Sequence, residues 1–414
     1  MSHSLIQIVS GQTLPNIFPA LVLPHAEIVL LHTPGTVAQC GWIAKALEKA
    51  GVGVRIQKRV LSDSPGIEET GRATIDAISD ARASGLAPIV NFTGGTKLMG
   101  IGAFVAAHQS KTPSFYLDAA NDQFTDGRTG DLPLALRDHW KAVKTIRQML
   151  NLDIVAAACG IESISPGRDP APFLPLALHL RHNAGERDAL LQAIDPKANP
   201  IFDPKKPEDV AQLLDTPVFD GVISEHAARL AADAGILEQR SGQWFFARPA
   251  SLEKLEDWLQ NEKPALPEWF AALAPLQTAI NFFGGGWWEL AVLDAARRAG
   301  IFSGIRWSVE VSIGGQTYEK DLIALENLNL AIFSCKRGGD KARRLVAAIE
   351  ELDSTARHIG GSHARRYFCV ACPISAERLA PIRMLAGHTN TILVGPASHL
   401  NPGSFAKPNH RPSL

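Results

Sequence analysis

The stretch at residues 309–339, VEVSIGGQTYEKDLIALENLNLAIFSCKRGG, carries the pattern that decides the fold of the C-terminal part of the chain. Its first residues alternate as far as Gly314 and Gly315, a pair that suits a tight hairpin with positive φ angles. The chain then returns as a second strand to Leu325, and residues 328–336 form an apolar run that predicts a third, largely buried strand. The stretch therefore predicts three consecutive strands.

Two of these strands carry a carboxylate and a lysine that can meet. Asp321 lies on the second strand, and alternation along the third places Ser334 and Lys336 on one face and Cys335 on the other. If the strands pair, the carboxylate and the ammonium approach a common point at the open edge of the sheet. Such a pair suits metal-assisted phosphodiester cleavage, in which the carboxylate holds Mg²⁺ or Mn²⁺ and the lysine steadies the attacking water. The alternative is an ordinary cross-strand ion pair.

Two further acids lie close to this stretch. Glu289 occupies the first turn of a predicted helix, GGGWWELAVLDAARRAG at residues 284–300, which is apolar on most of its circumference. It is either a second metal ligand or an acid that complements the helix dipole, and the sequence favours neither. Glu319 lies on the same strand face as Asp321 and is a further candidate acid.

The order of a helix with Glu289, three strands, a helix at about residues 340–357 and a strand at 367–372 resembles the core of restriction-endonuclease-like PD-(D/E)xK nucleases. The resemblance implies that Asp321, Glu289, the Cys335 carbonyl and water hold the metal, while Lys336 orients the nucleophile. Ser334 stands where that superfamily usually has Glu or Asp. Because a hydroxyl is a weaker ligand, we expect Ser334 only to assist.

The composition excludes several classes of protein. The chain has 414 residues, enough for about two or three domains, and 41 Lys and Arg against 42 Asp and Glu exclude a global basic field. The five scattered cysteines show no disulfide framework, and no apolar run is long enough for a bilayer, so we expect a cytoplasmic protein. Binding of a polynucleotide would therefore require a local cluster of basic residues. Basic residues that either serve this role or simply face water are Arg337, Lys341, Arg343, Arg344, Arg365 and Arg366.

The first half of the chain alternates strands and helices, which predicts a mainly parallel, doubly wound sheet. Strands are expected at residues 5–9 and 27–32, separated by a Pro-containing segment at 14–24. A later buried strand at 87–92 runs directly into Thr93-Gly94-Gly95-Thr96-Lys97 and a helix. Glycines, hydroxyls and the free N–H groups of a first helical turn suit phosphate, whereas the alternative is a Gly-rich turn capped by Thr96.

The segments IVSGQTLPN (8–16), HTPGT (32–36) and NFTGGTKLMG (91–100) resemble the CARF domain of CRISPR-associated nucleases that cyclic oligoadenylate activates, in particular those whose CARF domain precedes a PD-(D/E)xK domain. The resemblance implies a homodimer that binds a ring, most simply cyclic tetra-adenylate, across its two-fold axis. The ligand-binding residues that it implies are Thr33, Gly35, Thr36, Thr93, Gly94, Gly95, Thr96 and Lys97.

We therefore expect an α/β protein with a Rossmann-like CARF domain at residues 1–160, a linker and winged-helix-like region at 161–268, and a restriction-endonuclease-like domain at 269–414. A helix at 223–237 and a hairpin at 238–246 form the winged part, which serves either DNA binding or as an interdomain or dimer spacer. The expected function is activated, metal-dependent cleavage of DNA or RNA in type III CRISPR defence, without a membrane. An inactive nucleic-acid-binding regulator and an enzyme that degrades the ring are the alternatives.

Overall fold

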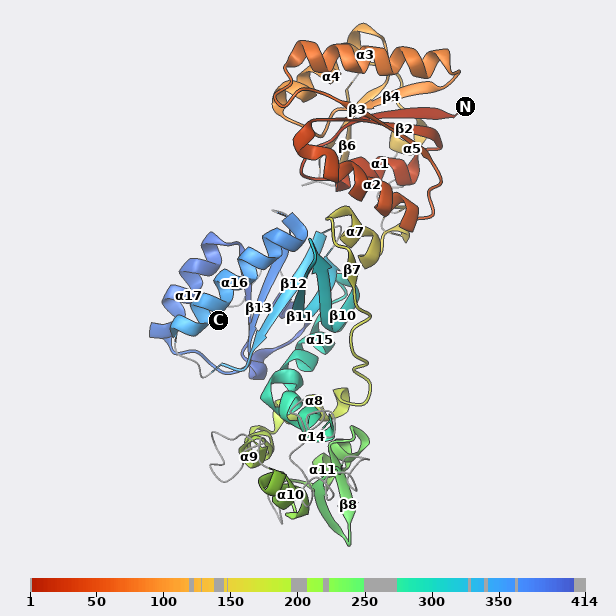
Figure 1. Ribbon diagram of the computed structural model, residues 1–414. Helices are drawn as coiled ribbons and strands as arrows, with labels where there is room; N and C mark the ends of the chain where they lie inside the picture. Colours follow the sequence, from red (N-terminus) through yellow and green to blue (C-terminus); the bar gives the residue numbers. More distant parts are fainter. Residues whose placement is uncertain are drawn as a thin grey trace.

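The computed structural model describes residues 2–118, 123–127, 129–137, 145–146, 148–194, 207–218, 223–248, 274–326, 329–338, 342–361 and 364–405. Each of three units has its own sheet, and the units follow one another along the molecule, with the N-terminal unit at one end (Figure 1). Two of them are α/β units, so the predicted fold class is confirmed. No helix in the described ranges is both long and apolar enough to cross a membrane.

The N-terminal sheet has the strand order β3-β2-β1-β4-β5-β6 and is parallel except that β6 runs antiparallel to β5. Helices α1 and α2 cover one face, and α3 and α4 cover the other (Figure 1). The strands are β1 (His3–Ile8), β2 (His25–His32), β3 (Arg55–Val60), β4 (Ala87–Asn91), β5 (Ser114–Asp118) and β6 (Gln123–Asp126). The helices are α1 (Leu14–Val22), α2 (Val37–Lys49), α3 (Ile67–Ala83), α4 (Lys97–Gln109) and α5 (Leu134–Arg137). The strand order reverses between β1 and β4, the position at which such sheets bind ligands.

Helix α1 occupies the Pro-containing segment for which the sequence predicted no element. Pro19 lies inside it and has no N–H to donate to the Pro15 carbonyl. The side-chain amide of Asn91, at the end of β4, donates to that carbonyl instead, at 2.9 Å. A distant strand thus supplies the hydrogen bond that the helix lacks, and no local pattern reveals this.

The second sheet has the order β14-β13-β12-β11-β10-β7, with antiparallel pairing from β7 to β12 and parallel pairing from β12 to β14. Helices α16 and α17 pack on one face and α15 on the other. The strands are β7 (Ser163–Ile164), β10 (Phe302–Ile313), β11 (Gln316–Glu326), β12 (Asn329–Lys336), β13 (Arg365–Val370) and β14 (Thr391–Val394). The helices are α15 (Trp287–Ala299), α16 (Ala342–Gly360) and α17 (Ala376–His388). Strand β7 lies within the predicted linker and forms an edge of this sheet.

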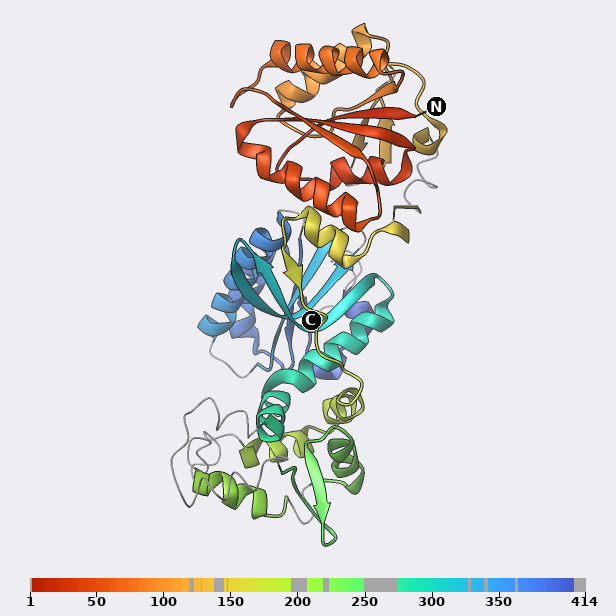
Figure 2. The ribbon, with the colours of Figure 1, turned by 45° about the vertical axis from the view of Figure 1, so that its right-hand side comes forward.

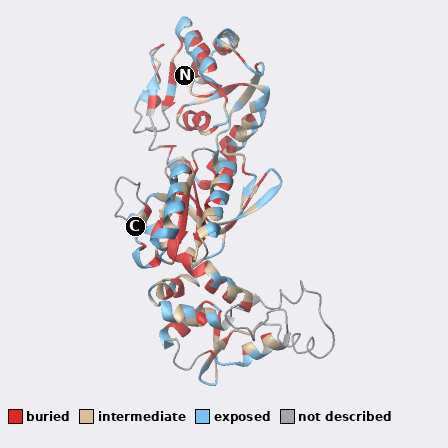
Figure 3. Cartoon of the chain, turned by 90° about the vertical axis from the view of Figure 1, so that its left-hand side faces the viewer, coloured by how far each residue is buried: buried red, intermediate tan, exposed pale blue. Residues whose placement is uncertain are grey.

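Helix α7 (Leu152–Ala158) joins the two α/β units. Its apolar residues belong to one continuous core with Ile43 of α2 and with Val309 and Val311 of β10. In Figure 1 the helix lies between the two units, and Figure 3 shows buried residues in both sheets and in the helices that flank them. The junction is therefore a packed interface and not only a covalent linker.

The third unit contains the predicted helix and hairpin. Its elements are α8 (Leu174–His182), α9 (Ala184–Ile194), α10 (Pro207–Asp215), α11 (Glu225–Asp233), β8 (Leu237–Arg240), β9 (Gln243–Phe246) and α14 (Ala274–Asn281). The hairpin turns at Ser241 and Gly242, whose φ angles of 50° and 83° suit a tight turn. This unit lies beyond the second sheet (Figures 1 and 2), so its interpretation as a spacer between the two α/β units is wrong. The predicted boundary between residues 268 and 269 lies outside the described residues.

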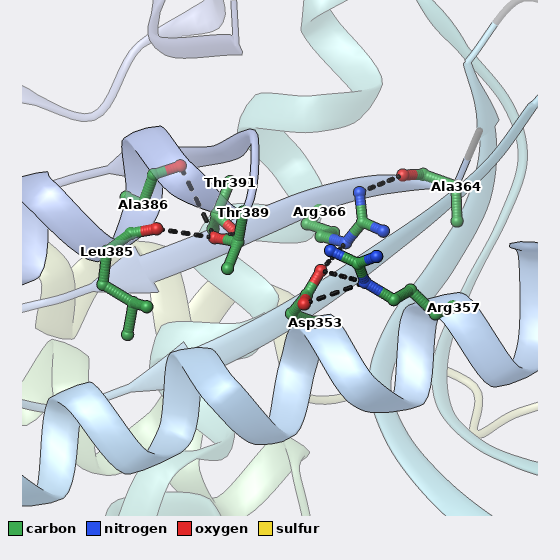
Figure 4. A network of polar contacts seen from close by, with 8 residues as sticks. All are labelled: Asp353, Arg357, Ala364, Arg366, Leu385, Ala386, Thr389 and Thr391. Atoms are coloured by element: carbon green, nitrogen blue, oxygen red, sulfur yellow. Dashed lines mark hydrogen bonds and ion pairs between the residues drawn. The ribbon is translucent and has the colours of Figure 1, made fainter. Parts of the chain in front are cut away.

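Arg366 joins α16 to β13, so it neither faces water nor is available to bind a polynucleotide, the two alternatives that the sequence left open. The side chain is 5% exposed, and its Nε pairs with Asp353 Oδ1 at 2.8 Å, while Nη1 donates to the Ala364 carbonyl at 3.0 Å (Figure 4). Arg357 contacts the same carboxylate at 2.9 Å from an exposed position. Arg366 also lies four residues along the strand from the position opposite Lys336, because its register partner is Ile332 and that of Lys336 is Val370.

Two arginines on one carboxylate provide a matched test of burial. We expect Arg366→Ala to lower the free energy of unfolding by about 3 kcal/mol, because it leaves Asp353 partly buried beside an empty site. Arg357→Ala should cost less than about 1 kcal/mol, because that pair is screened by water. Urea denaturation of the two variants measures both values, and equal losses would contradict this interpretation.

Candidate functional site

The loop between β4 and α4 is built for close backbone approach. A side chain at Gly94 would place its Cβ 2.0 Å from the Ile8 carbonyl oxygen, and Gly95 has a φ of 77°, so neither position suits another residue. Thr96 caps α4, since its Oγ1 accepts the Met99 N–H at 3.3 Å. Thr96 and Lys97 are both exposed. The cap and a ligand site are therefore compatible, because capping uses the hydroxyl oxygen and leaves its proton available to donate.

Thr93 anchors this loop to the ends of β4 and β5. Its hydroxyl donates to Asn91 Oδ1 at 2.6 Å and accepts the Leu117 N–H at 2.7 Å. The Asn91 amide donates in turn to Gln7 Oε1 at 2.9 Å, and both of these residues are fully buried. The Thr93 hydroxyl is thus engaged within the protein, in contrast to the ligand contact that the sequence predicted.

Gln7 and Asn91 are functional candidates that the sequence analysis missed. They form a buried amide pair at the ends of β1 and β4, where the strand order reverses. A satisfied polar network of this kind restricts the loop above it to one conformation. The sequence feature that could have identified them is a polar residue within each of two otherwise apolar strands.

The loop between β2 and α2 lies at the same edge of the sheet. Thr33 and Thr36 bond to each other, with Thr36 Oγ1 accepting the Thr33 N–H at 3.1 Å, and Gly35 between them is exposed. Strand β1 separates β2 from β4, so the two loops stand about 10 Å apart, two strand spacings. Together they flank the end of β1, at the edge of the sheet where the strand order reverses, and this edge is called the switch-point edge below.

In the second sheet, β10 and β11 break their alternation beside Asp321. Val309 packs in the core on the α16 side and Trp307 in the core on the α15 side, although regular alternation would place both on one face. Ser308, between them, has a φ of 49°, which is unusual for a residue other than glycine. Ser308 and Asp321 lie opposite each other, between the register pairs Trp307–Leu322 and Val309–Lys320.

Asp321 closes the ladder between β11 and β12 with its side chain. The last backbone pair is Leu322 with Phe333, and beyond it Asp321 Oδ2 accepts the Cys335 N–H at 2.5 Å. The carboxylate therefore sits in the plane of the sheet, where the strands diverge. The carbonyl of a strand residue points to the same side as its N–H, so the Cys335 carbonyl faces Asp321 as well.

Glu289 reaches this point from α15, on the other side from α16. Its Oε2 accepts the indole N–H of Trp307 at 2.8 Å. Burial, with Asp321 and Glu319 nearby, raises the pKa of Glu289 to about 7, against the opposing effects of Trp307 and Lys336. The structure thus brings Glu289, Glu319, Asp321 and Lys336 together, and the sequence did not identify Trp307.

Asp321 is also held in a dry environment. Burial raises its pKa above the usual range, although the Cys335 N–H and Lys336 favour the charged form. Ser334 shares a sheet face with Phe368, its register partner in the α16-side core, whereas Glu289 approaches from the α15 side. Ser334 and Glu289 therefore flank Asp321 from opposite faces.

The donor set suits a hard divalent cation. Glu289 and Asp321 each keep one carboxylate oxygen outside the bonds described above, and a bound cation would relieve the repulsion that raises their pKa values. No group of three or more His, Cys, Asp or Glu side chains in the described ranges is arranged to hold a metal. Mg²⁺ or Mn²⁺ would therefore take the Cys335 carbonyl and water as further ligands.

The winged unit does not present free cations on its hairpin. Arg240 stacks over Phe245 at 3.8 Å, and both Arg240 and Arg248 contact Asp215. Trp244 donates to Glu225 at 3.0 Å in the first turn of α11. The acids adjacent to these cations argue against nonspecific phosphate binding here. Of the other basic candidates, Arg343 and Arg344 are exposed at the start of α16, and Lys341 lies outside the described residues.

Residues 4–129 match the family model described as the Card1 CARF domain. No curated protein matches the chain. The chain is similar in structure to Can2 from Sulfobacillus thermosulfidooxidans in complex with cyclic tetra-adenylate, at 17% identity over 96% of this chain and 97% of that chain, with a TM-score of 0.65. It is equally similar to protein VC1899 from Vibrio cholerae, at 15% identity over 96% and 95%, with a TM-score of 0.65.

A third similar structure is that of a type III CRISPR defence DNA nuclease activated by cyclic oligoadenylate. The match has 16% identity, covers 91% of this chain and 47% of that chain, and has a TM-score of 0.50. At these identities the likenesses establish the fold, with a Rossmann-like N-terminal unit and a C-terminal α/β unit.

The raised pKa of Glu289 predicts a dependence of stability on pH. Between pH 4.5, its ordinary value, and about pH 7, the folded chain retains a proton that the unfolded chain releases, so stability falls as pH rises. We expect Glu289→Gln to remove this slope and to raise the free energy of unfolding at pH 8 by about 1–3 kcal/mol. Urea denaturation with chelator at pH 5 and pH 8 measures it.

The control for this experiment is Glu377→Gln, which neutralises an exposed acid in the first turn of α17. Its effect should be the same at both pH values. A Glu289→Gln effect that is also the same at pH 5 and pH 8 would contradict the burial of an ionised Glu289.

Proposed function

We propose that this protein is a metal-dependent endonuclease of type III CRISPR antiviral defence, which cyclic oligoadenylate activates. The observation that carries the proposal is one chain holding two sites: a Gly-rich loop at the switch point of a sheet that matches a CARF model, and paired acids with a lysine where β11 and β12 diverge. The Can2 structure contains cyclic tetra-adenylate, and the third relative is a DNA nuclease activated by cyclic oligoadenylate, which supports this assignment.

The proposed domains are the CARF domain at residues 1–160, the linker and winged region at 161–268, and a PD-(D/E)xK nuclease domain at 269–414. In the first, the switch-point edge over β1 receives the phosphates of the ring. The backbone of Gly94 and Gly95 permits close approach, the Thr96 hydroxyl donates, and Lys97 supplies charge at the start of α4. Thr33, Gly35 and Thr36 border the other side.

The proposed assembly is a cytoplasmic homodimer. Helix α4 exposes an apolar face directly after the ligand loop, and the dimer would bury it with a second copy of itself, because a two-fold ring requires equivalent loops from two chains. The side chains of this face, each at least 36% exposed, are Leu98, Ile101, Phe104 and Val105. Their continuity with the loop favours a ring held across the dimer axis.

In the proposed mechanism Asp321 and Glu289 would hold Mg²⁺ or Mn²⁺, which when bound polarises the phosphodiester and lowers the pKa of water. Lys336 orients the attacking water and offsets the charge that develops on the phosphate oxygens. The Cys335 N–H holds the Asp321 carboxylate in place by a hydrogen bond. Glu319 adds a further negative charge near Glu289. Ser334, on the α16 side, donates a hydrogen bond to water in the site.

Ser334 favours a second candidate function. Where a stronger ligand is replaced by a hydroxyl, the nuclease domain can lose its cleavage activity, and the protein would then be a ligand-responsive regulator that binds nucleic acid. Degradation of the ring by the N-terminal domain is the other alternative. Incubation of labelled DNA and RNA with Mg²⁺ or Mn²⁺, with and without cyclic tetra-adenylate, separates these functions, because uncut substrate contradicts the nuclease and shortened activator reveals a ring-degrading enzyme.

Lys336→Ala tests the assignment of the site. We expect cleavage to fall by at least about a hundredfold, since the variant loses the charge next to the reacting phosphate. Binding of cyclic tetra-adenylate, measured by calorimetry, should not change. Cleavage at the wild-type rate by this variant would refute the site assignment.

Lys97→Ala tests the sensor. Loss of an ammonium beside phosphate should weaken binding of cyclic tetra-adenylate by roughly tenfold or more and raise the activator concentration needed for cleavage accordingly. The matched control is Lys49→Ala, an exposed lysine in the last turn of α2, on the other face of the sheet. The same titration should give one ring for two chains, and a ratio of one to one would contradict the dimer.

A further inference from the structure

A line of polar contacts connects the switch-point edge of the N-terminal sheet with Glu289. It begins in the loop after β1, which lies between the loops after β2 and β4. The Thr13 hydroxyl, which is buried, donates to the Ala158 carbonyl at the C-terminal end of α7. Helix α7 is thus bonded directly to one of the loops that surround the candidate ligand site.

The other end of α7 is bonded to the second sheet. Asp153, in its first turn, accepts two hydrogen bonds from Arg306 of β10, at 3.2 Å to Oδ1 and 2.7 Å to Oδ2. The same guanidinium lies 3.4 Å from the carbonyls of Ile164 and Ser165, so it also holds β7. A two-point contact between an arginine and a carboxylate fixes both direction and distance.

Trp307, the residue after Arg306, donates to Glu289 at 2.8 Å. Successive strand residues point to opposite faces, which is why Arg306 faces α7 while Trp307 faces α15. The left-handed backbone at Ser308 then reverses the alternation, so that Val309 rejoins the α16-side core. The residue bonded to α7 and the residue bonded to the Glu289 carboxylate are therefore adjacent on one strand.

We propose that Arg306 and Trp307 are positioning residues that transmit the state of the N-terminal loop, through Thr13, α7 and Asp153, to the Glu289 carboxylate. This inference rests on the proposed function and names its regulation. When ring binding shifts the loop after β1, the hydrogen bond from Thr13 displaces α7. Through Asp153 and Arg306 this displaces β10, and Trp307 then changes the orientation of the Glu289 carboxylate. Neither residue touches the reacting atoms.

Linkage provides a test that needs no cleavage. If the ring and the metal site are coupled in this way, cyclic tetra-adenylate must tighten Mn²⁺ binding by the same factor by which Mn²⁺ tightens ring binding, roughly tenfold or more. Calorimetric or electron paramagnetic resonance titrations of the full-length protein with Mn²⁺, with and without cyclic tetra-adenylate, measure this factor.

Three variants locate the coupling. Asp153→Asn should bring the factor close to one and leave ring affinity without Mn²⁺ unchanged, and Arg306→Lys, which keeps the charge but loses the two-point contact, should give a smaller factor than wild type. Trp307→Phe should weaken Mn²⁺ binding by roughly tenfold with or without the ring, because the Glu289 carboxylate loses its donor.

Matched controls separate these effects from loss of packing. Trp288→Phe removes another buried indole, which donates to the Cys369 carbonyl at 3.1 Å, and Asp80→Asn removes an acid paired with Arg59 at 2.5 Å within the N-terminal unit. Neither should alter the coupling factor or Mn²⁺ affinity.

Each outcome decides between the two proposals. A wild-type factor that persists in Asp153→Asn and Arg306→Lys, or Mn²⁺ affinity reduced equally in Trp307→Phe and Trp288→Phe, overturns the inference. A wild-type protein that binds both ligands with a factor of one also overturns it and leaves the proposed function intact. Wild-type protein that binds neither ligand refutes the proposed function itself.

Discussion

The hydrogen bond from the Cys335 N–H to the Asp321 carboxylate is the interaction on which the candidate catalytic site depends. It replaces the next backbone pair of the β11–β12 ladder and so ends the ladder at Leu322 and Phe333. A side chain that closes a ladder is held in the sheet plane, with little freedom to turn to water. The acid is thereby presented, together with the Cys335 carbonyl, close to both Glu289 and Lys336.

The two candidate sites share a physical design. In each, polar groups are fixed by buried partners: the Gly-rich loop follows the buried pair Gln7 and Asn91, and the Glu289 carboxylate accepts a hydrogen bond from Trp307. Buried hydrogen bonds are strong because water cannot compete for them. The second site carries a cost, because burial and like charges raise the pKa values of both acids, and this cost disappears when a divalent cation neutralises them.

Helix α7 connects the two candidate sites through packing and hydrogen bonds. Its apolar side packs in one core with α2 and β10, and its polar ends bond to Thr13 and Arg306. Packed interfaces of this kind tend to have discrete arrangements and do not deform continuously, because their interiors are already dense. A change at one sheet is therefore expressed at the other as a shift of a whole element. The winged unit, at the far end of the molecule, lies outside this route (Figure 1).

The sequence by itself determined the features that depend on neighbouring residues: most strands and helices of the two α/β units, though not α1 or β7, the hairpin at Gly314 and Gly315, the Gly-rich loop, and the approach of Asp321 to Lys336. These follow from alternation and backbone freedom, which are local. Only the tertiary structure decided that Glu289 joins them, that Trp307 orients it, that Thr93 turns inward and that Arg366 is buried. Each of these outcomes depends on which distant element covers a side chain, and burial and hydrogen-bond partners are properties of the packed chain.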